Sequence, residues 1–220
     1  VLMSCLSFVM AGCSGHSKNL KFGAADIGGV YYSFASTFTQ LADKEIDGYT
    51  FETKTTAGSV ANLRLISDGY IDLAIAQADL LSDAYNATGT FADKKYQKGY
   101  KAVASLYTEC CQIVVRKDSG ITGIDDLINK TVSVGASESG SEKNAEQILK
   151  MSGITDELIN KVNMDYTEAA EKLKAGEIDA FFCTAGTRTE VIGQLSKECD
   201  ICLISCLLYT SPSPRDGATS

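Results

Sequence analysis

Residues 51–79 read FETKTTAGSVANLRLISDGYIDLAIAQAD, and their pattern predicts the fold class. Residues 51–56 alternate in polarity as a strand does, and a loop of small residues follows them. The next residues carry an apolar face at helical spacing as far as Gly69, and 71–76 form a second apolar strand. A strand, a helix and a strand in this order predict a βαβ unit with a parallel sheet and helix cover.

Polar residues follow the predicted strands, at the edge where open α/β sheets bind ligands. Ser59 opens the helix of the βαβ unit, and Gln77 follows its second strand. Upstream, the turn after a strand over 20–25 holds Gly29 and a tyrosine pair, Tyr31 and Tyr32. Glycine allows a ligand close to the backbone, and one tyrosine of the pair is expected in the core and the other in a pocket.

The second half of the chain repeats this arrangement. A strand over 130–135 leads into a hydroxyl-rich loop before a helix, and a buried strand over 178–183 ends at a threonine. Free N–H groups at such a helix start can hold an oxyanion, although an ordinary N-cap cluster has the same pattern. The candidate ligand-binding residues in this half are Ser137, Ser139, Gly140, Ser141 and Thr184. Further expectations are a strand over 100–107, a helix over 158–162 and a strand over 164–166.

Three sets of motifs carry a family resemblance. They are TAGSVANL at 56–63 with DLAI and QAD shortly after it, GGVYY at 28–32, and VVRKDSGI at 114–121 followed by VSVG and SGS. In this order and spacing the sequence resembles the TAXI family, the extracytoplasmic solute receptors of one class of TRAP transporters. The resemblance runs from about residue 20 to about residue 204.

The resemblance implies an α/β chain with the two-lobed, type II periplasmic-binding-protein-like fold, each lobe a mostly parallel sheet with flanking helices. The first lobe would span 19–109 and the second 110–204, with a hinge near 108–111. A family member would return to the first lobe after 204, so we expect that lobe to be incomplete and to expose apolar surface. The tail 205–220, which holds both prolines, is expected to be artefactual.

The implied function is capture of a small anionic or zwitterionic organic solute, of carboxylate or amino acid type, and its delivery to TRAP transporter membrane subunits. The net charge of −8 without a basic cluster argues against nucleic acid as a partner. Helix N-termini would hold an anion, and Arg116 and Arg188 rank below them.

The N-terminal segment 1–18 is expected to be a lipoprotein signal peptide and polar tether. A short apolar run ends in Met10-Ala11-Gly12, and Cys13 follows. A lipid on Cys13 would anchor the protein to the outer face of the cell membrane. The alternative is a buried N-terminal strand with an incidental cysteine.

Catalysis has little support in the sequence. The only histidine is His16, in the tether, so no Ser–His or Cys–His pair is expected in the core, and no cofactor or metal motif is present. An enzyme on the same architecture would need Cys183 as its nucleophile, without a basic partner. A sensor domain would need a signalling segment. Of the eight cysteines, Cys5 and Cys13 belong to the N-terminal segment; the other six are best explained as small buried hydrophobes, and their pairing stays open.

Overall fold

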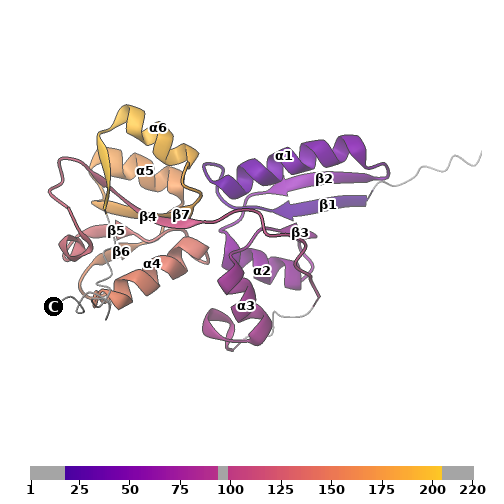
Figure 1. Cartoon of the computed structure of the whole chain (residues 1–220), viewed down its shortest axis with the longest axis horizontal. Helices are drawn as coiled ribbons and strands as arrows, with labels where there is room; N and C mark the ends of the chain where they lie inside the picture. Colours follow the sequence, from indigo (N-terminus) through magenta and orange to yellow (C-terminus); the bar gives the residue numbers. More distant parts are fainter. Residues whose placement is uncertain (1–17, 94–98, 205–220) are drawn as a thin grey trace, which may run out of the picture.

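The computed structural model describes residues 18–93 and 99–204. Cys13 and the tail 205–220 lie outside the described residues. The described strands form two separate sheets in two lobes that lie side by side (Figure 1). Strands before residue 109 belong to the first sheet, and strands after it belong to the second.

The first lobe is a three-stranded parallel sheet between helices. Its strand order is β2-β1-β3. Helix α1 covers one side, and its inner face buries Ala35, Thr39 and Ala42, while α2 and α3 lie on the other side (Figure 1). The elements are β1 (Lys18–Gly23), α1 (Val30–Glu45), β2 (Tyr49–Lys54), α2 (Ser59–Ser67), β3 (Leu73–Ala74), α3 (Ala78–Asn86) and the short helix η1 (Gly89–Phe91).

The second lobe is a five-stranded mixed sheet with the order β6-β5-β7-β4-β8. Strand β4 runs antiparallel to β7 and β8, and β5 is parallel to β6 and β7. Helix α4 lies on one side and α5 and α6 on the other (Figure 1). The elements are β4 (Cys110–Arg116), η2 (Ile124–Leu127), β5 (Thr131–Ser133), α4 (Gly140–Met151), β6 (Asn160–Val162), α5 (Tyr166–Ala175), β7 (Ala180–Ala185), α6 (Glu190–Glu198) and β8 (Ile201–Ile204).

Strand β7 forms the centre of the second lobe, and all six of its residues are buried. Phe182 packs with the core beneath α4, whereas Phe181 and Cys183 pack with the core beneath α5 and α6. A strand covered on both faces needs apolar residues at every position, which explains the continuous apolar run in the sequence. The mostly parallel α/β architecture in two lobes is therefore confirmed.

Three local expectations were wrong. The strand expected over 100–107 is absent: residues 101–109 have no regular secondary structure, and among the described residues no strand pairs with them. The expected helix over 158–162 is instead the strand β6, which pairs with β5. The expected strand over 164–166 gives way to the start of α5, because the Asp165 side chain accepts a hydrogen bond from Glu168 N at 2.8 Å and caps that helix.

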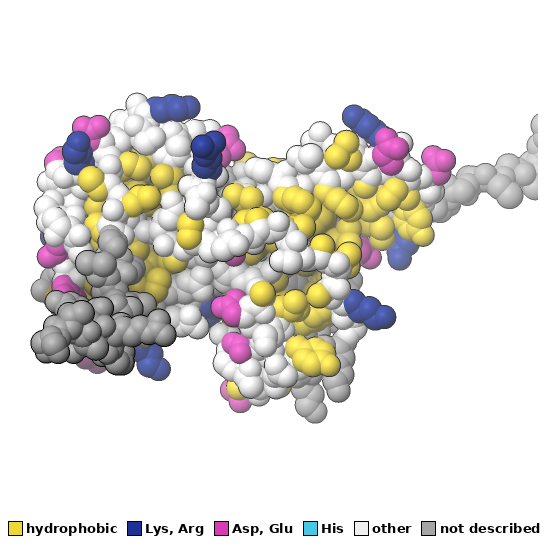
Figure 2. All heavy atoms as spheres, in the orientation of Figure 1, with side chains coloured by type: hydrophobic (Ala, Val, Ile, Leu, Met, Phe, Trp, Pro, Cys, Tyr) yellow, Lys and Arg dark blue, Asp and Glu magenta, His cyan; other side chains and the backbone are white. Residues whose placement is uncertain are grey.

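The first lobe exposes an apolar face around α1. Figure 2 shows hydrophobic side chains gathered over this lobe, and Phe34, Phe38 and Leu41 of α1 are 37, 37 and 56% exposed. Phe38 still makes an edge-on ring contact with Phe22 of β1. Within 18–93 and 99–204, no helix has both the length and the apolar character that a bilayer crossing requires.

Candidate functional site

A cavity of about 300 Å³ lies between the lobes, and residues of both lobes line it. The first lobe contributes the loops that follow β1, β2 and β3, and the second contributes the start of α4 and the end of β7. These loops meet there because the strand ends that precede α-helices in parallel βα units point to one edge of each sheet. The cavity therefore lies at the carboxyl ends of the strands, where the sequence predicts ligand binding.

The structure brings most of the candidate residues together. Those that line the cavity are Gly29, Tyr31, Ser59, Gln77, Ser139, Gly140, Ser141 and Thr184. Tyr32 is not a lining residue, since it packs against the first-lobe core with Phe22 and Ile75. Ser137 is exposed and also lies outside the lining. Both tyrosines pack against the first-lobe core, and of the two only Tyr31 also lines the cavity.

The first-lobe wall is held by hydrogen bonds between its own loops. The backbone N–H of Gln77 donates to Ser59 Oγ at 3.1 Å, and Ser59 Oγ shares a second hydrogen bond with Tyr31 Oη at 3.4 Å. Behind them, the fully buried Asn62 donates through Nδ2 to Ala24 O at 2.6 Å and to Ile75 O at 2.8 Å. Asn62, which the sequence analysis did not single out, thus joins the loops after β1 and β3.

The second-lobe wall is built on the N-terminus of α4. Ser139 caps this helix by accepting from Glu142 N at 3.0 Å. The Ser141 hydroxyl accepts from Thr184 N at 2.9 Å and also hydrogen-bonds Tyr166 Oη, which in turn donates to Thr184 O at 2.9 Å. The Ser141 side chain is therefore used by the fold, whereas first-turn backbone N–H groups lack intrahelical acceptors and can face a ligand.

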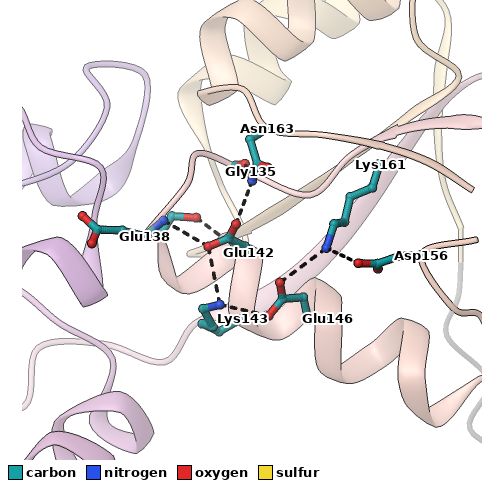
Figure 3. Close-up of polar contacts among 9 residues, drawn as sticks. Gly135, Glu138, Glu142, Lys143, Glu146, Asp156, Lys161 and Asn163 are labelled. Atoms are coloured by element: carbon teal, nitrogen blue, oxygen red, sulfur yellow. Dashed lines mark hydrogen bonds and ion pairs between the residues drawn. The ribbon is translucent and has the colours of Figure 1, made fainter. Parts of the chain in front are cut away.

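A polar network behind α4 supports the loop that enters it (Figure 3). The Glu142 carboxylate accepts from Asn163 Nδ2 at 2.9 Å and from Glu138 N at 3.0 Å, and Asn163 also donates to Gly135 O at 3.0 Å. The Lys143 Nζ atom lies 3.6 Å from Glu142 Oε2 and 3.0 Å from Glu146 Oε2. These contacts fix the loop between β5 and α4, and with it the second-lobe wall.

The lobes also touch beside the cavity. Arg64 of α2 forms an ion pair with Glu138 at 2.6 Å, and Ala61 N donates to Glu138 O at 3.1 Å. Glu138 has a φ of 65°, a left-handed conformation that is uncommon for a residue other than glycine. Gly58, with a φ of 123°, leaves room for Ser139 across the gap.

Among the cavity residues that the sequence analysis missed are Tyr107 and Glu109. They lie on the segment that crosses from the first lobe to β4. Tyr107 Oη donates to Glu109 Oε1 at 3.2 Å, and Tyr31 Oη donates to Glu109 Oε2 at 3.3 Å. Burial raises the pKa of Glu109 above its ordinary value of 4.5, and hydrogen bonds from Gln77 and the two tyrosines oppose that rise. The sequence feature that could have indicated Glu109 is its position as a lone carboxylate directly before the apolar strand β4.

The residues considered for other chemistry lie elsewhere. Neither Arg116 nor Arg188 lines the cavity, and Arg116 donates to Leu173 O at 2.9 Å beyond the far end of β4. Burial raises the pKa of the Cys183 thiol to about 12, so Cys183 stays a protonated thiol at neutral pH. In the described part of the chain, no three His, Cys, Asp or Glu side chains are placed to hold a metal ion.

Comparison with known proteins places the chain in a family. The sequence model of the NMT1-like family matches residues 22–207. This chain belongs to the NMT1-like family. The match covers both lobes and every loop that lines the cavity.

The NMT1-like chain is also similar in structure to solved binding proteins. The alkanesulfonate-binding protein SsuA from Xanthomonas axonopodis pv. citri, bound to MOPS, has a TM-score of 0.57 at 17% identity, with 85% of this chain and 60% of that one covered. Holo ArgBP from T. maritima has a TM-score of 0.56 at 18% identity, with 85% of this chain and 78% of that one covered. A binding protein component of an ABC phosphonate transporter from Pseudomonas aeruginosa has a TM-score of 0.57 at 12% identity, with 86% of this chain and 65% of that one covered. The fold is the two-lobed, type II periplasmic-binding-protein fold. This chain spans 60% of the length of the SsuA chain.

Proposed function

We propose that this chain is an extracytoplasmic solute-binding receptor that captures a small organic solute, anionic or zwitterionic, between its lobes. The observation that carries the proposal is the 300 Å³ interlobe cavity, whose walls come from both lobes. Pockets of about 300–1,000 Å³ hold small molecules, and an interlobe position allows closure around a solute. Similarity in fold to sulfonate-, arginine- and phosphonate-related binding proteins supports this function.

Delivery to a membrane transporter is the second part of the proposal. The TAXI-like motifs favour TRAP-type membrane subunits as the partner, whereas three of the solved neighbours are named as ABC transporters or parts of them. A lipid on Cys13 would hold the receptor at the outer face of the membrane. The Cys13→Ala variant is expected to move from the membrane fraction to the soluble fraction, and unchanged membrane association would contradict the anchor.

A thermal-shift screen of the full chain against a library of organic acids, amino acids and amines tests solute capture. We expect at least one compound to raise the melting temperature, and calorimetric titration to show one site without turnover. Ser59→Ala should weaken that binding about fivefold, since one hydrogen bond contributes about 1 kcal/mol. Ser67→Ala, at the other end of α2, is the matched control. A library without any stabilising compound would argue against the proposal.

A further inference from the structure

The interlobe cavity carries carboxylates and no positive side chain of its own. Asp26, Glu109 and Asp165 line it, and none of the described residues that line it is Lys, Arg or His. Burial raises the pKa of Asp26 above its ordinary value, and the charge of the nearby Asp165 adds to the rise, whereas a hydrogen bond from Thr167 Oγ1 at 3.2 Å opposes it. A solute with only negative charge would meet this field without a compensating cation.

Glu109 is the most enclosed of these carboxylates, and its oxygens are oriented by three side chains. Tyr31 and Tyr107 each donate to a different oxygen, and the Gln77 side chain hydrogen-bonds Glu109 as well. A carboxylate has about four lone-pair positions, so one remains for a further donor. The tyrosines hold the carboxylate in place without neutralising it, because burial raises the pKa of both phenols and keeps them protonated.

Gln77 provides a second acceptor at the same place. The residue is only 9% exposed, and its Oε1 has no hydrogen-bond partner among the described residues. Its amide nitrogen is the group that can donate to Glu109, so the oxygen is left as an unused acceptor. A buried acceptor without a partner is unfavourable, and an incoming N–H donor would satisfy it.

We propose that Glu109 and Gln77 form a subsite for the protonated amine of the solute, so that the receptor selects solutes with an ammonium group over those without one. This inference rests on the proposed function of solute capture. An ammonium group supplies positive charge and up to three N–H donors, which match one buried carboxylate and one open amide oxygen. A carboxylate on the same solute would face the first turns of α2 and α4.

The test uses two pools of compounds that share their carbon skeletons. One pool contains primary amines and amino acids, and the other contains the same molecules with hydrogen in place of each amine. We expect stabilising compounds in the amine pool only, with calorimetry showing at least tenfold weaker binding of each amine-free analogue. If only amine-free compounds bind, capture holds and this inference is overturned. If no compound in either pool or in the wider library binds, the proposed function fails.

Glu109→Gln tests the assignment of the residue. Loss of a charged hydrogen-bond partner should weaken binding of the amine-bearing compounds about 10- to 100-fold and leave amine-free analogues unaffected. The control is Glu45→Gln, an exposed carboxylate at the end of α1. Equal affinity of Glu109→Gln and wild type would overturn the assignment. The comparison of the two pools on the wild-type chain stands even if this variant does not fold.

The pH dependence offers a second measurement on the wild-type chain. Groups that face Glu109 are Tyr31 from α1, Tyr107 from the crossing segment, Asp79 from α3 and Gln77. The pKa of Glu109 is raised, so protonation abolishes its charge at a higher pH than for a free carboxyl. Affinity for an amine should fall about tenfold per pH unit below that pKa, because binding then requires release of one proton. Glu109→Gln should remove this dependence, and a wild-type affinity that is flat with pH would contradict the subsite.

Discussion

Replacement of Asn62 by alanine should measurably destabilise the first lobe. The Asn62 amide joins the ends of β1 and β3 through its hydrogen bonds to Ala24 O and Ile75 O, and its Oδ1 accepts from Thr56 Oγ1 at 2.7 Å. Because Asn62 is fully buried, water cannot reach these groups to replace the hydrogen bonds that its side chain makes. Alanine would leave the buried Ile75 carbonyl without this donor, at about 1–3 kcal/mol, whereas the Ala24 carbonyl can keep the hydrogen bond from Thr56 Oγ1 at 2.9 Å.

The expected loss of unfolding free energy is therefore about 1–3 kcal/mol, against a typical total of about 5–15 kcal/mol. Urea denaturation followed by circular dichroism measures it. With a slope near 2 kcal/mol/M, the urea midpoint should fall by about 0.5–1.5 M. If Asn62→Ala does not fold, Thr56→Val is a milder variant, since it removes one donor to the same cluster.

Asn19→Ala is the matched control, because Asn19 is an exposed asparagine in the same lobe, and its side-chain hydrogen bonds to Glu52 at 3.3 Å and from Thr50 Oγ1 at 3.2 Å both lie at the surface. Its effect should stay within about 0.5 kcal/mol. If Asn62→Ala and Asn19→Ala unfold at the same urea concentration, the buried amide does not hold the strand ends together, and the reasoning is refuted.

Three further predictions concern the cavity and its surroundings. Gly140→Ala should weaken solute binding at least tenfold with little loss of helix stability, because a Cβ there would overlap the Gln77 carboxamide; calorimetry and thermal melting separate the two effects. Cys183 should stay unmodified by iodoacetamide at pH 8 in mass spectrometry, since its thiol is buried and its pKa is about 12; rapid labelling of the folded chain would contradict this. Arg64→Gln should lower stability by no more than about 1 kcal/mol, because its ion pair with Glu138 is partly exposed, and a larger loss would show a stronger lobe contact.

Much of the fold follows from the sequence alone. The apolar run at β7 predicts a strand buried on both faces, and the alternation before Ser59 predicts a strand followed by a helix. The position of polar residues at strand ends also predicts which loops form the cavity, because those ends meet at one edge of a sheet. Local patterns carry this information, since strand period, helix spacing and caps depend on residues close together in the chain.

Tertiary contacts decided what each side chain does in the cavity. Ser141 turned out to have its hydroxyl bound by Thr184 and Tyr166, partners that lie 43 and 25 residues away. Glu109 lies on a segment without regular structure, so no periodic pattern placed it beside Tyr31, which lies 78 residues earlier. The negative character of the cavity depends on how these distant side chains converge as the lobes face one another. The spacing of residues along the chain does not predict which side chains meet in the cavity, because these contacts form only once both sheets have packed.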